Sequence, residues 1–346
     1  GDEELYAIKH VLDSGRLVQG PLVERFEQRI ASRCNRNYAI AVSSGTSALE
    51  LALNAIELDA GDEVICPALS WPSPAHAIIL SGATPVIVDV HAKDWNLDPE
   101  AASHARGSRT RAAIVIDQFG MPARWSELQA SLKGLILIED AACGIGSYHS
   151  QGPCGSFGTI SILSFHPRKV VTTGEGGMCL TDDPAIAERL RILRNHGQRS
   201  PGIFLSAAGN QRLSEIAAAM GLAQLDRLDT MLEKRRFLAQ RYRDALPHMQ
   251  WQAMPAGAQS NMQTMGAVLN IPRDPVIESL RRQGIESARL SYELSMLPSI
   301  QPFARVPSPT QNAQHIATHG LALPLHPNMN TEDQDRVIQA LHEFLR

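Results

Sequence analysis

The sequence of 346 residues is poor in cysteine, and neither sign of charge dominates it. Its five cysteines are widely spaced and include no C-x-x-C pair, which argues against a disulfide framework and against a structural zinc site. With 32 basic and 36 acidic residues the net charge is −4, so no global basic field attracts nucleic acid or an anionic membrane. The acidic first residues do not resemble a secretion signal. We therefore expect a reducing, cytoplasmic location and no metal site.

The chain also lacks a long hydrophobic run. Its longest uncharged stretch, residues 64–88, contains four prolines, a histidine and several serines, which is typical of strand, loop and helix inside a globular protein and not of a membrane span. Apolar residues make up 44% and charged residues 20%, so long disorder and a coiled coil are excluded. The length suggests about two domains.

Short apolar runs alternate with helix-like segments through the first two-thirds of the chain. Strands are predicted at 38–42, 63–66, 85–90, 112–116, 135–138, 159–165 and 177–180, and helices between them at 46–56, 76–80 and 126–132. This alternation predicts an α/β domain with a mostly parallel sheet. A long helix is expected over 213–246 and a last helix over 331–344. We place a domain boundary near residue 235, giving a large domain 1–235 and a smaller domain 236–346.

The small residues of segment 43–48, Ser-Ser-Gly-Thr-Ser-Ala, lie between a predicted strand and a predicted helix. They allow a ligand to approach the backbone closely, and the free N–H groups and partial positive charge of a helix N-terminus suit a phosphate. The same pattern also marks an ordinary capped turn, so it does not define a phosphate site by itself.

Two further segments carry side chains that could take part in binding or catalysis. The strand at 135–138 leads into Glu139 and Asp140, where a carboxylate could hold a protonated ring nitrogen or could simply cap a helix. Lys169 follows the strand at 159–165 and precedes a Thr/Gly-rich turn. A partly desolvated lysine amine is a nucleophile toward carbonyls, whereas a surface lysine only packs its stem on the sheet.

Taken together, in this order and spacing, these blocks resemble the pyridoxal-phosphate-dependent sugar aminotransferases of the DegT family. The resemblance runs from Ser14 to Pro327, and its most specific part is S-F-H-P-R-K at 164–169 with T-G-E-G-G at 173–177. It implies the type I, aspartate-aminotransferase-like fold, with a large, mostly parallel-sheet domain and a smaller α+β C-terminal domain. It also implies pyridoxal 5′-phosphate as the cofactor.

The resemblance implies a role for each matching residue. Lys169 would bond covalently to the cofactor's aldehyde and shuttle the substrate proton, and Asp140 would pair with the pyridine nitrogen so that the ring acts as an electron sink. Trp71 would stack on the ring face, although tryptophan is more often a core residue. The phosphate would be bound by Gly45, Thr46 and Ser164.

Further implied roles concern a second subunit and a departure from the family pattern. Asn210, with Arg212, would reach the phosphate of the neighbouring subunit's cofactor, which requires a homodimer with shared active sites. Cys143 stands where the family often has glutamine or histidine contacting the cofactor's phenolic oxygen, and a thiol is a weak hydrogen-bond donor. Segment 261–266 also departs from the pattern, since aromatic residues and histidine are expected there.

The implied reaction transfers an amino group from glutamate or glutamine to a keto-sugar nucleotide. Aminotransferases that act on a cyclic keto-polyol in antibiotic assembly share the same motifs and remain an alternative. Dehydratases on this scaffold carry a histidine in place of the lysine, and a non-catalytic regulatory relative would not require Lys169, Asp140 and Ser164 together. A nicotinamide-binding fingerprint is excluded because His149 occupies the position of its third glycine.

Overall fold

A seven-stranded sheet forms the centre of the protein in the computed structural model, which describes residues 1–345. The strand order is β1-β10-β9-β6-β5-β2-β4. Strands β9, β6, β5, β2 and β4 run parallel, and β10 runs antiparallel to both β1 and β9, so the expected mostly parallel sheet is present. Its strands are β1 (Tyr38–Val42), β2 (Glu63–Pro67), β4 (Thr84–Val88), β5 (Thr110–Ile116), β6 (Ile136–Asp140), β9 (Ile160–Ser164) and β10 (Gly177–Thr181).

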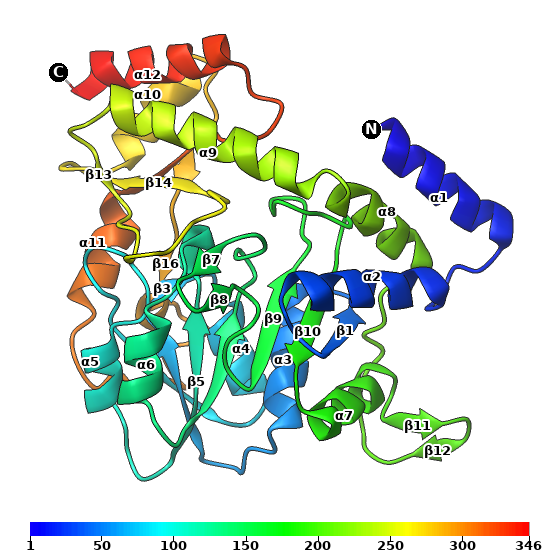
Figure 1. Ribbon diagram of the computed structural model, residues 1–346. Coiled ribbons are helices and arrows are strands. Elements are labelled where there is room, and N and C mark those ends of the chain that lie inside the picture. Colours follow the sequence, from blue (N-terminus) through cyan, green and yellow to red (C-terminus); the bar gives the residue numbers. More distant parts are fainter. Residues whose placement is uncertain (346) are drawn as a thin grey trace.

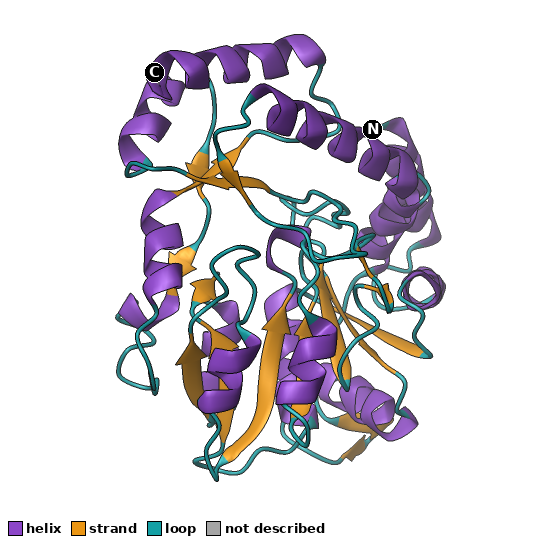
Figure 2. Ribbon diagram, turned by 60° about the vertical axis from the view of Figure 1, so that its left-hand side comes forward, coloured by secondary structure: helices purple, strands orange, loops and turns teal. Residues whose placement is uncertain are grey.

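Helices cover both faces of this sheet, as Figures 1 and 2 show. Alternate residues of a strand point to opposite faces, so Ile138 of β6 packs in the core with helices α3, α4 and α7, whereas Leu137 packs in the core with α5 and α6. Helices α2 and α8 pack together in a third core. These helices are α2 (Pro21–Arg33), α3 (Gly45–Ala55), α4 (Ser73–Leu80), α5 (Pro99–His104), α6 (Trp125–Ser131), α7 (Pro184–Arg194) and α8 (Glu215–Leu225).

A second, antiparallel sheet has the order β13-β14-β17-β15 and is built from the C-terminal part of the chain. It shares a core with α9, α10 and α12. The elements are α9 (Leu228–Ala245), β13 (Gln250–Trp251), β14 (Met265–Val268), α10 (Asp274–Arg282), β15 (Ala288–Arg289), β17 (Gly320–Leu323) and α12 (Thr331–Leu345). The arrangement is the α+β layer that the resemblance implies.

The segment after β15 returns to the large sheet. Strand β16 (Tyr292–Glu293) pairs with β3 (Leu69–Ser70), η2 (Leu294–Met296) follows it, and α11 (Gln311–His319) packs into the core beside α3 and α4. The guanidinium of Arg305 then forms an ion pair with Glu63 at 2.9 Å. The C-terminal third of the chain therefore also packs against the large domain.

One expected helix is divided in the structure. The segment predicted as a single helix over 213–246 forms α8 and α9, which are separated at Asp226 and Arg227. Arg227 forms ion pairs with Glu3 and Glu4 of α1 (Asp2–Ser14), a tertiary contact that a local pattern does not contain. Helix α9 runs without interruption through position 235, and the domain boundary there stays a prediction.

Two short hairpins complete the described chain, with a 3₁₀ turn, η1 (Gln118–Gly120), after β5. The first pairs β7 (Tyr148–His149) with β8 (Gly152–Pro153), and the second pairs β11 (Gln198–Ser200) with β12 (Ile203–Phe204) and projects from the body near α7 (Figure 1). Within residues 1–345, no helix combines the length and the apolar character needed to cross a membrane.

Candidate active site

The candidate residues gather at one edge of the large sheet. Asp140 ends β6, Ser164 ends β9, and Gly45 begins α3 just after β1. These three strands run in the same direction, so their carboxyl ends meet at one edge, which is where ligands bind in open α/β sheets. Lys169 lies a few residues beyond the end of β9. The topology thus brings together groups that are more than 100 positions apart in sequence.

Lys169 is half-buried, and its amine lies beside a thiol. Its Nζ donates a hydrogen bond to Sγ of Cys143 at 3.0 Å, and its backbone N–H donates to the carbonyl of His166 at 2.8 Å. The local turn therefore aims the side chain toward the end of β6. The two residues that the resemblance assigns to the cofactor's reactive side are thus in contact.

Asp140 is almost completely buried, with 4% of its surface exposed. Burial raises its pKa from the ordinary value of 3.8 to about 6, although the N–H of Ala142 and the positive charge of Lys169 pull the pKa down. Among residues 1–345, the Ala142 N–H, at 3.0 Å, is the only hydrogen-bond donor to this carboxylate. A buried carboxylate with one free oxygen favours a cationic N–H partner, such as a protonated pyridine nitrogen.

The N-terminus of α3 has the donor groups and the open space that an anion cradle would need. Ser44 caps the helix by accepting the Ser47 N–H at 3.0 Å, which leaves the first N–H groups of the helix at Gly45 and Thr46 available. A methyl group on Gly45 would lie 2.8 Å from Cβ and 3.0 Å from Oγ of Ser164, so only glycine leaves this space open. The donor set of N–H groups and hydroxyls suits a phosphate, and these residues fit a phosphorylated cofactor.

Trp71 is 60% exposed and lies two residues before Ser73, whose hydroxyl accepts a hydrogen bond from the Thr46 hydroxyl at 3.1 Å. Its ring meets the ring of Tyr292 edge to face, with the centroids 5.6 Å apart. The pairing of β3 with β16 creates this contact. Trp71 is thus not a core residue, and its exposed face is available for stacking. Tyr292 was not selected from the sequence, because it is brought here by a chain segment more than 200 residues away.

Asn210 and Arg212 lie close to the strand that enters the anion cradle. Arg212 bridges to Val42 at the end of β1, and the carbonyl of Gln211 accepts the Ser43 N–H at 2.9 Å. The Arg212 guanidinium bonds to Oδ1 of Asn195. The contact of Asn210 and Arg212 with a neighbouring subunit's phosphate stays a prediction.

Segment 261–266, which departs from the family pattern, supports the site from the C-terminal part of the chain. Asn261 is fully buried, and its Nδ2 donates to the carbonyls of Cys143 at 2.7 Å and Ile145 at 2.8 Å. Gln263 donates to the carbonyl of Arg168 at 2.9 Å. Both amides therefore fix backbone next to the Lys169–Cys143 contact. The sequence marked this block as unusual, but its contacts depend on the fold.

The fold defines the class of protein. A seven-stranded sheet of this order, with a helix N-terminus, a buried carboxylate and a lysine at the same edge, is that of the pyridoxal-phosphate-dependent aminotransferases. The chain belongs to the DegT/DnrJ/EryC1/StrS aminotransferase family, whose sequence profile matches residues 1–342. The family resemblance, the fold class, the enzyme class and the cofactor predicted from the sequence are therefore confirmed.

Solved structures of similar proteins agree with this assignment. DesV from S. venezuelae, solved in complex with a ketimine intermediate, is 32% identical with a TM-score of 0.95, covering 99% of this chain and 94% of that chain. A DegT/DnrJ/EryC1/StrS aminotransferase from Brucella abortus is 30% identical with a TM-score of 0.93, covering 99% and 95%. A variant of a GDP-4-keto-6-deoxymannose-3-dehydratase (ColD), with bound GDP-perosamine, is 25% identical with a TM-score of 0.93, covering 99% and 97%.

Proposed function

We propose that this enzyme transfers an amino group from glutamate or glutamine to a keto-sugar nucleotide. The observation that carries the proposal is the contact of the Lys169 amine with Cys143, at the sheet edge that also holds Asp140 and the anion cradle of α3. A relative of the same fold has a nucleotide-linked amino sugar, GDP-perosamine, bound to it, which supports a sugar nucleotide as the substrate class.

The proposed cofactor contacts follow from the donors and charges at this edge. Gly45 and Thr46 would bind the phosphate through their N–H groups and Ser164 through its hydroxyl, and Asp140 would hold the protonated ring nitrogen. Trp71 would cover one face of the ring. Pyridoxal 5′-phosphate, when bound, supplies an electron sink for the electron pair that remains after the substrate's C–H bond breaks.

Lys169 would move the proton in both half-reactions. Its Nζ would take the proton from the α-carbon of the amino donor and deliver it to the C4′ carbon of the cofactor. With the keto sugar, Nζ would move a proton in the opposite direction, from C4′ to the sugar carbon that receives the amino group. Lysine suits this task because its amine can lose its charge on burial, whereas an arginine would stay charged. The Sγ of Cys143, 3.0 Å away, would hold the amine at the reacting edge.

We also propose a homodimer with shared active sites, located in the cytoplasm. The β11–β12 hairpin and the residue after it expose three large apolar side chains, Ile203, Phe204 and Leu205, at 52%, 62% and 57%. Such a cluster on a projecting arm is typical of a protein interface. The same loop leads into Asn210 and Arg212, so a subunit that buries the hairpin would bring these two residues toward its partner.

A dehydratase is the second candidate, because ColD, a relative with the same fold, is one. The presence of Lys169 favours amino transfer, since the resemblance places a histidine at this position in dehydratases. The test is incubation of the enzyme, loaded with pyridoxal 5′-phosphate, with a panel of keto-sugar nucleotides, cyclic keto-polyols and glutamate, followed by mass spectrometry. An amino-sugar nucleotide supports the proposal, whereas a deoxy sugar or an aminated polyol would replace it.

A further inference from the structure

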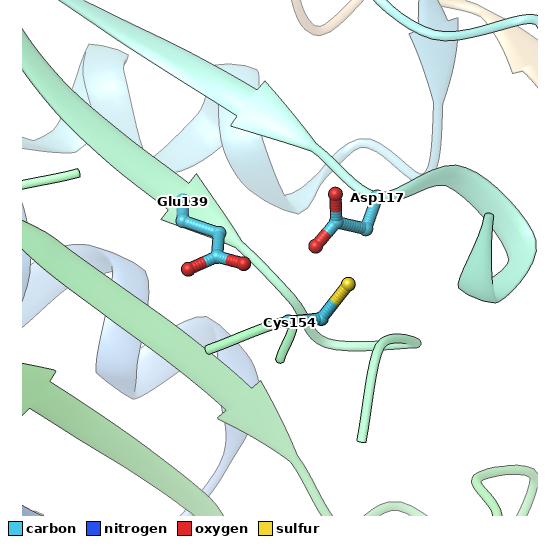
Figure 3. Close-up of side chains that lie close together, drawn as sticks. All are labelled: Asp117, Glu139 and Cys154. Carbon is cyan, nitrogen blue, oxygen red and sulfur yellow. The ribbon is translucent and has the colours of Figure 1, made fainter. Parts of the chain in front are cut away.

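Three ionisable side chains, one of them on the strand that ends at Asp140, lie close together (Figure 3). Asp117 follows β5, Glu139 is on β6 and Cys154 follows β8, and their exposed fractions are 0%, 0% and 1%. One carboxylate oxygen of each acid and the sulfur lie within 4.8 Å of one another. Side chains alternate along a strand, so Glu139 points to the face opposite Asp140. The function proposed above does not use this cluster.

The hydrogen bonds of the two acids are unequal. Each oxygen of Glu139 accepts one backbone N–H, from Gly155 at 2.7 Å and from Phe157 at 2.8 Å. Oδ1 of Asp117 accepts the N–H of Ala123 at 2.9 Å and Nε1–H of Trp125 at 3.3 Å. Oδ2 of Asp117 is buried and has no hydrogen-bond partner within the described chain. A buried carboxylate oxygen without a partner destabilises the folded state. If the oxygen carries a proton, it becomes a donor that can bond to a neighbouring acceptor.

Two ionised carboxylates are not sustainable at this position. Burial raises the pKa of both Asp117 and Glu139, and a negative charge on either carboxyl opposes ionisation of the other, so one of the two keeps its proton. Burial also raises the pKa of Cys154, so its thiol keeps its proton. The charged neighbour on the packed elements, Arg36, donates to the carbonyls of Gly155 and Gly158 and pairs with Asp182 at 2.8 Å.

The other ionisable neighbours supply no positive charge. The Cys34 thiol is fully buried, with its pKa raised to about 12, and Asp140 is itself an acid. No hydrogen bond or ion pair joins either carboxylate of the cluster to a cationic side chain among residues 1–345.

We propose that Asp117 and Glu139 share one proton, which Oδ2 of Asp117 carries and donates to Glu139. Oδ2 is the oxygen with room for a hydrogen, because both oxygens of Glu139 already face N–H donors. The pair then keeps a single negative charge, on Glu139. Two carboxyls forced together in a buried site hold one proton for the same reason in other proteins.

This pair acts on the active site through Asp140. The Asp117 N–H donates to the carbonyl of Asp140 at 3.0 Å, and Glu139 is the preceding residue. Asp117 is therefore a positioning residue for Asp140. The single negative charge that the pair keeps lies next to Asp140 in the chain, so it opposes ionisation of Asp140 and favours retention of a proton between Asp140 and a bound ring nitrogen. This part of the inference rests on the proposed function.

Two isosteric amides form a matched pair of test variants. In Asp117→Asn, an amide N–H takes the place of the proposed O–H and can donate to Glu139, so we expect the folded, cofactor-loaded enzyme to keep close to wild-type stability. In Glu139→Gln, the amide N–H must face the backbone N–H of Gly155 or Phe157. We expect a folding equilibrium constant roughly 10- to 100-fold lower, the usual effect of an unsatisfied buried donor.

Infrared spectroscopy provides a readout that a structural role alone would not change. At pH 8 the loaded wild-type enzyme should show the C=O stretch of one protonated, buried carboxyl, at a pH where Asp140 is ionised. Asp117→Asn should remove this band. It should also shift the pH profile of cofactor absorbance only slightly, because Glu139 keeps its charge.

Three results would overturn the proposal. The first is a band that persists in Asp117→Asn or is absent from the wild type. The second is the reverse order of stability, with Glu139→Gln tolerated and Asp117→Asn disrupted, which would put the proton on Glu139. The third is one tightly bound divalent metal per chain that disappears in Asp117→Asn. The band and the stabilities need no substrate, so failure of the amino-transfer assay leaves them interpretable, and their failure leaves the proposed reaction standing.

Discussion

Replacing Asp140 by asparagine should make the cofactor-free enzyme more stable while it weakens the function. Burial raises the pKa of Asp140 from 3.8 to about 6, a difference of about two units. Each unit corresponds to about 1.4 kcal/mol, so the ionised carboxylate destabilises the folded state by about 3 kcal/mol. Asparagine keeps the bond from the Ala142 N–H and removes the charge, although its amide N–H lacks a partner, which offsets about 1–3 kcal/mol of this gain.

The sign of the pH dependence follows from proton uptake. Between about pH 4 and pH 6 Asp140 binds up to one proton more in the folded state than in the unfolded chain, so its contribution to stability falls as the pH rises and then levels off. Asp140→Asn lacks this loss. Its stability relative to wild type should therefore grow by about 1.4 kcal/mol per pH unit across this window and stay constant above it.

The assay is urea denaturation of both cofactor-free proteins from pH 4 to pH 8. Asp333→Asn, which changes an exposed carboxyl in the first turn of α12, is the control for the chemical substitution and should follow the wild-type curve. Parallel curves for wild type and Asp140→Asn, or a relative stability that falls with pH, would refute the burial argument. Asp140→Asn should also bind pyridoxal 5′-phosphate more weakly than the wild type does, because the ring nitrogen loses its anionic partner.

Three further predictions address the other parts of the site. Lys169→Ala should slow the half-reaction with glutamate by more than about 10⁴-fold in stopped-flow absorbance, since proton transfer alone contributes about 10²–10⁴; near-normal kinetics would exclude its role. Gly45→Ala should weaken cofactor binding in a fluorescence titration and lower stability, because the new methyl group meets Ser164. Adding Ser164→Gly should restore stability but not affinity. Unchanged affinity in the single variant would contradict the cradle. Phe204→Ser should dissociate the dimer in sedimentation, whereas Phe303→Ser, at a phenylalanine of similar exposure, should not; a wild-type monomer would contradict the interface.

The buried strands were predictable because each is a short apolar run in a sheet that helices cover on both faces. The runs at 38–42 and 112–116 correspond to β1 and β5. The N-cap of α3 was also foreseeable, since a serine pair before an apolar helical pattern is a local signal. Lys169, Asp140 and Gly45 were noticeable by their positions after such strands, but each also had an ordinary structural explanation, and their roles came from the family resemblance. Local patterns were therefore sufficient for the large sheet, and the resemblance was needed to select the residues at its edge.

Long-range pairings were beyond the reach of the sequence patterns. Tyr292 meets Trp71 only because β16, a two-residue strand, pairs with β3. Asn261 reaches the Cys143 carbonyl across more than 100 residues. The Asp117–Glu139 contact depends on the register of β5 against β6, since Val115 pairs with Glu139. None of these contacts leaves a periodic signal, because each joins single residues of separate elements.

The proposed function requires the Lys169 amine to bond covalently to the aldehyde of pyridoxal 5′-phosphate. The most direct measurement is borohydride reduction of the loaded enzyme, followed by proteolysis and mass spectrometry of the peptides. We expect a stable phosphopyridoxyl adduct on the peptide that contains Lys169, and no such adduct in Lys169→Ala. An adduct confined to another lysine, or no adduct in a folded, fully loaded enzyme, would show that Lys169 does not have this role.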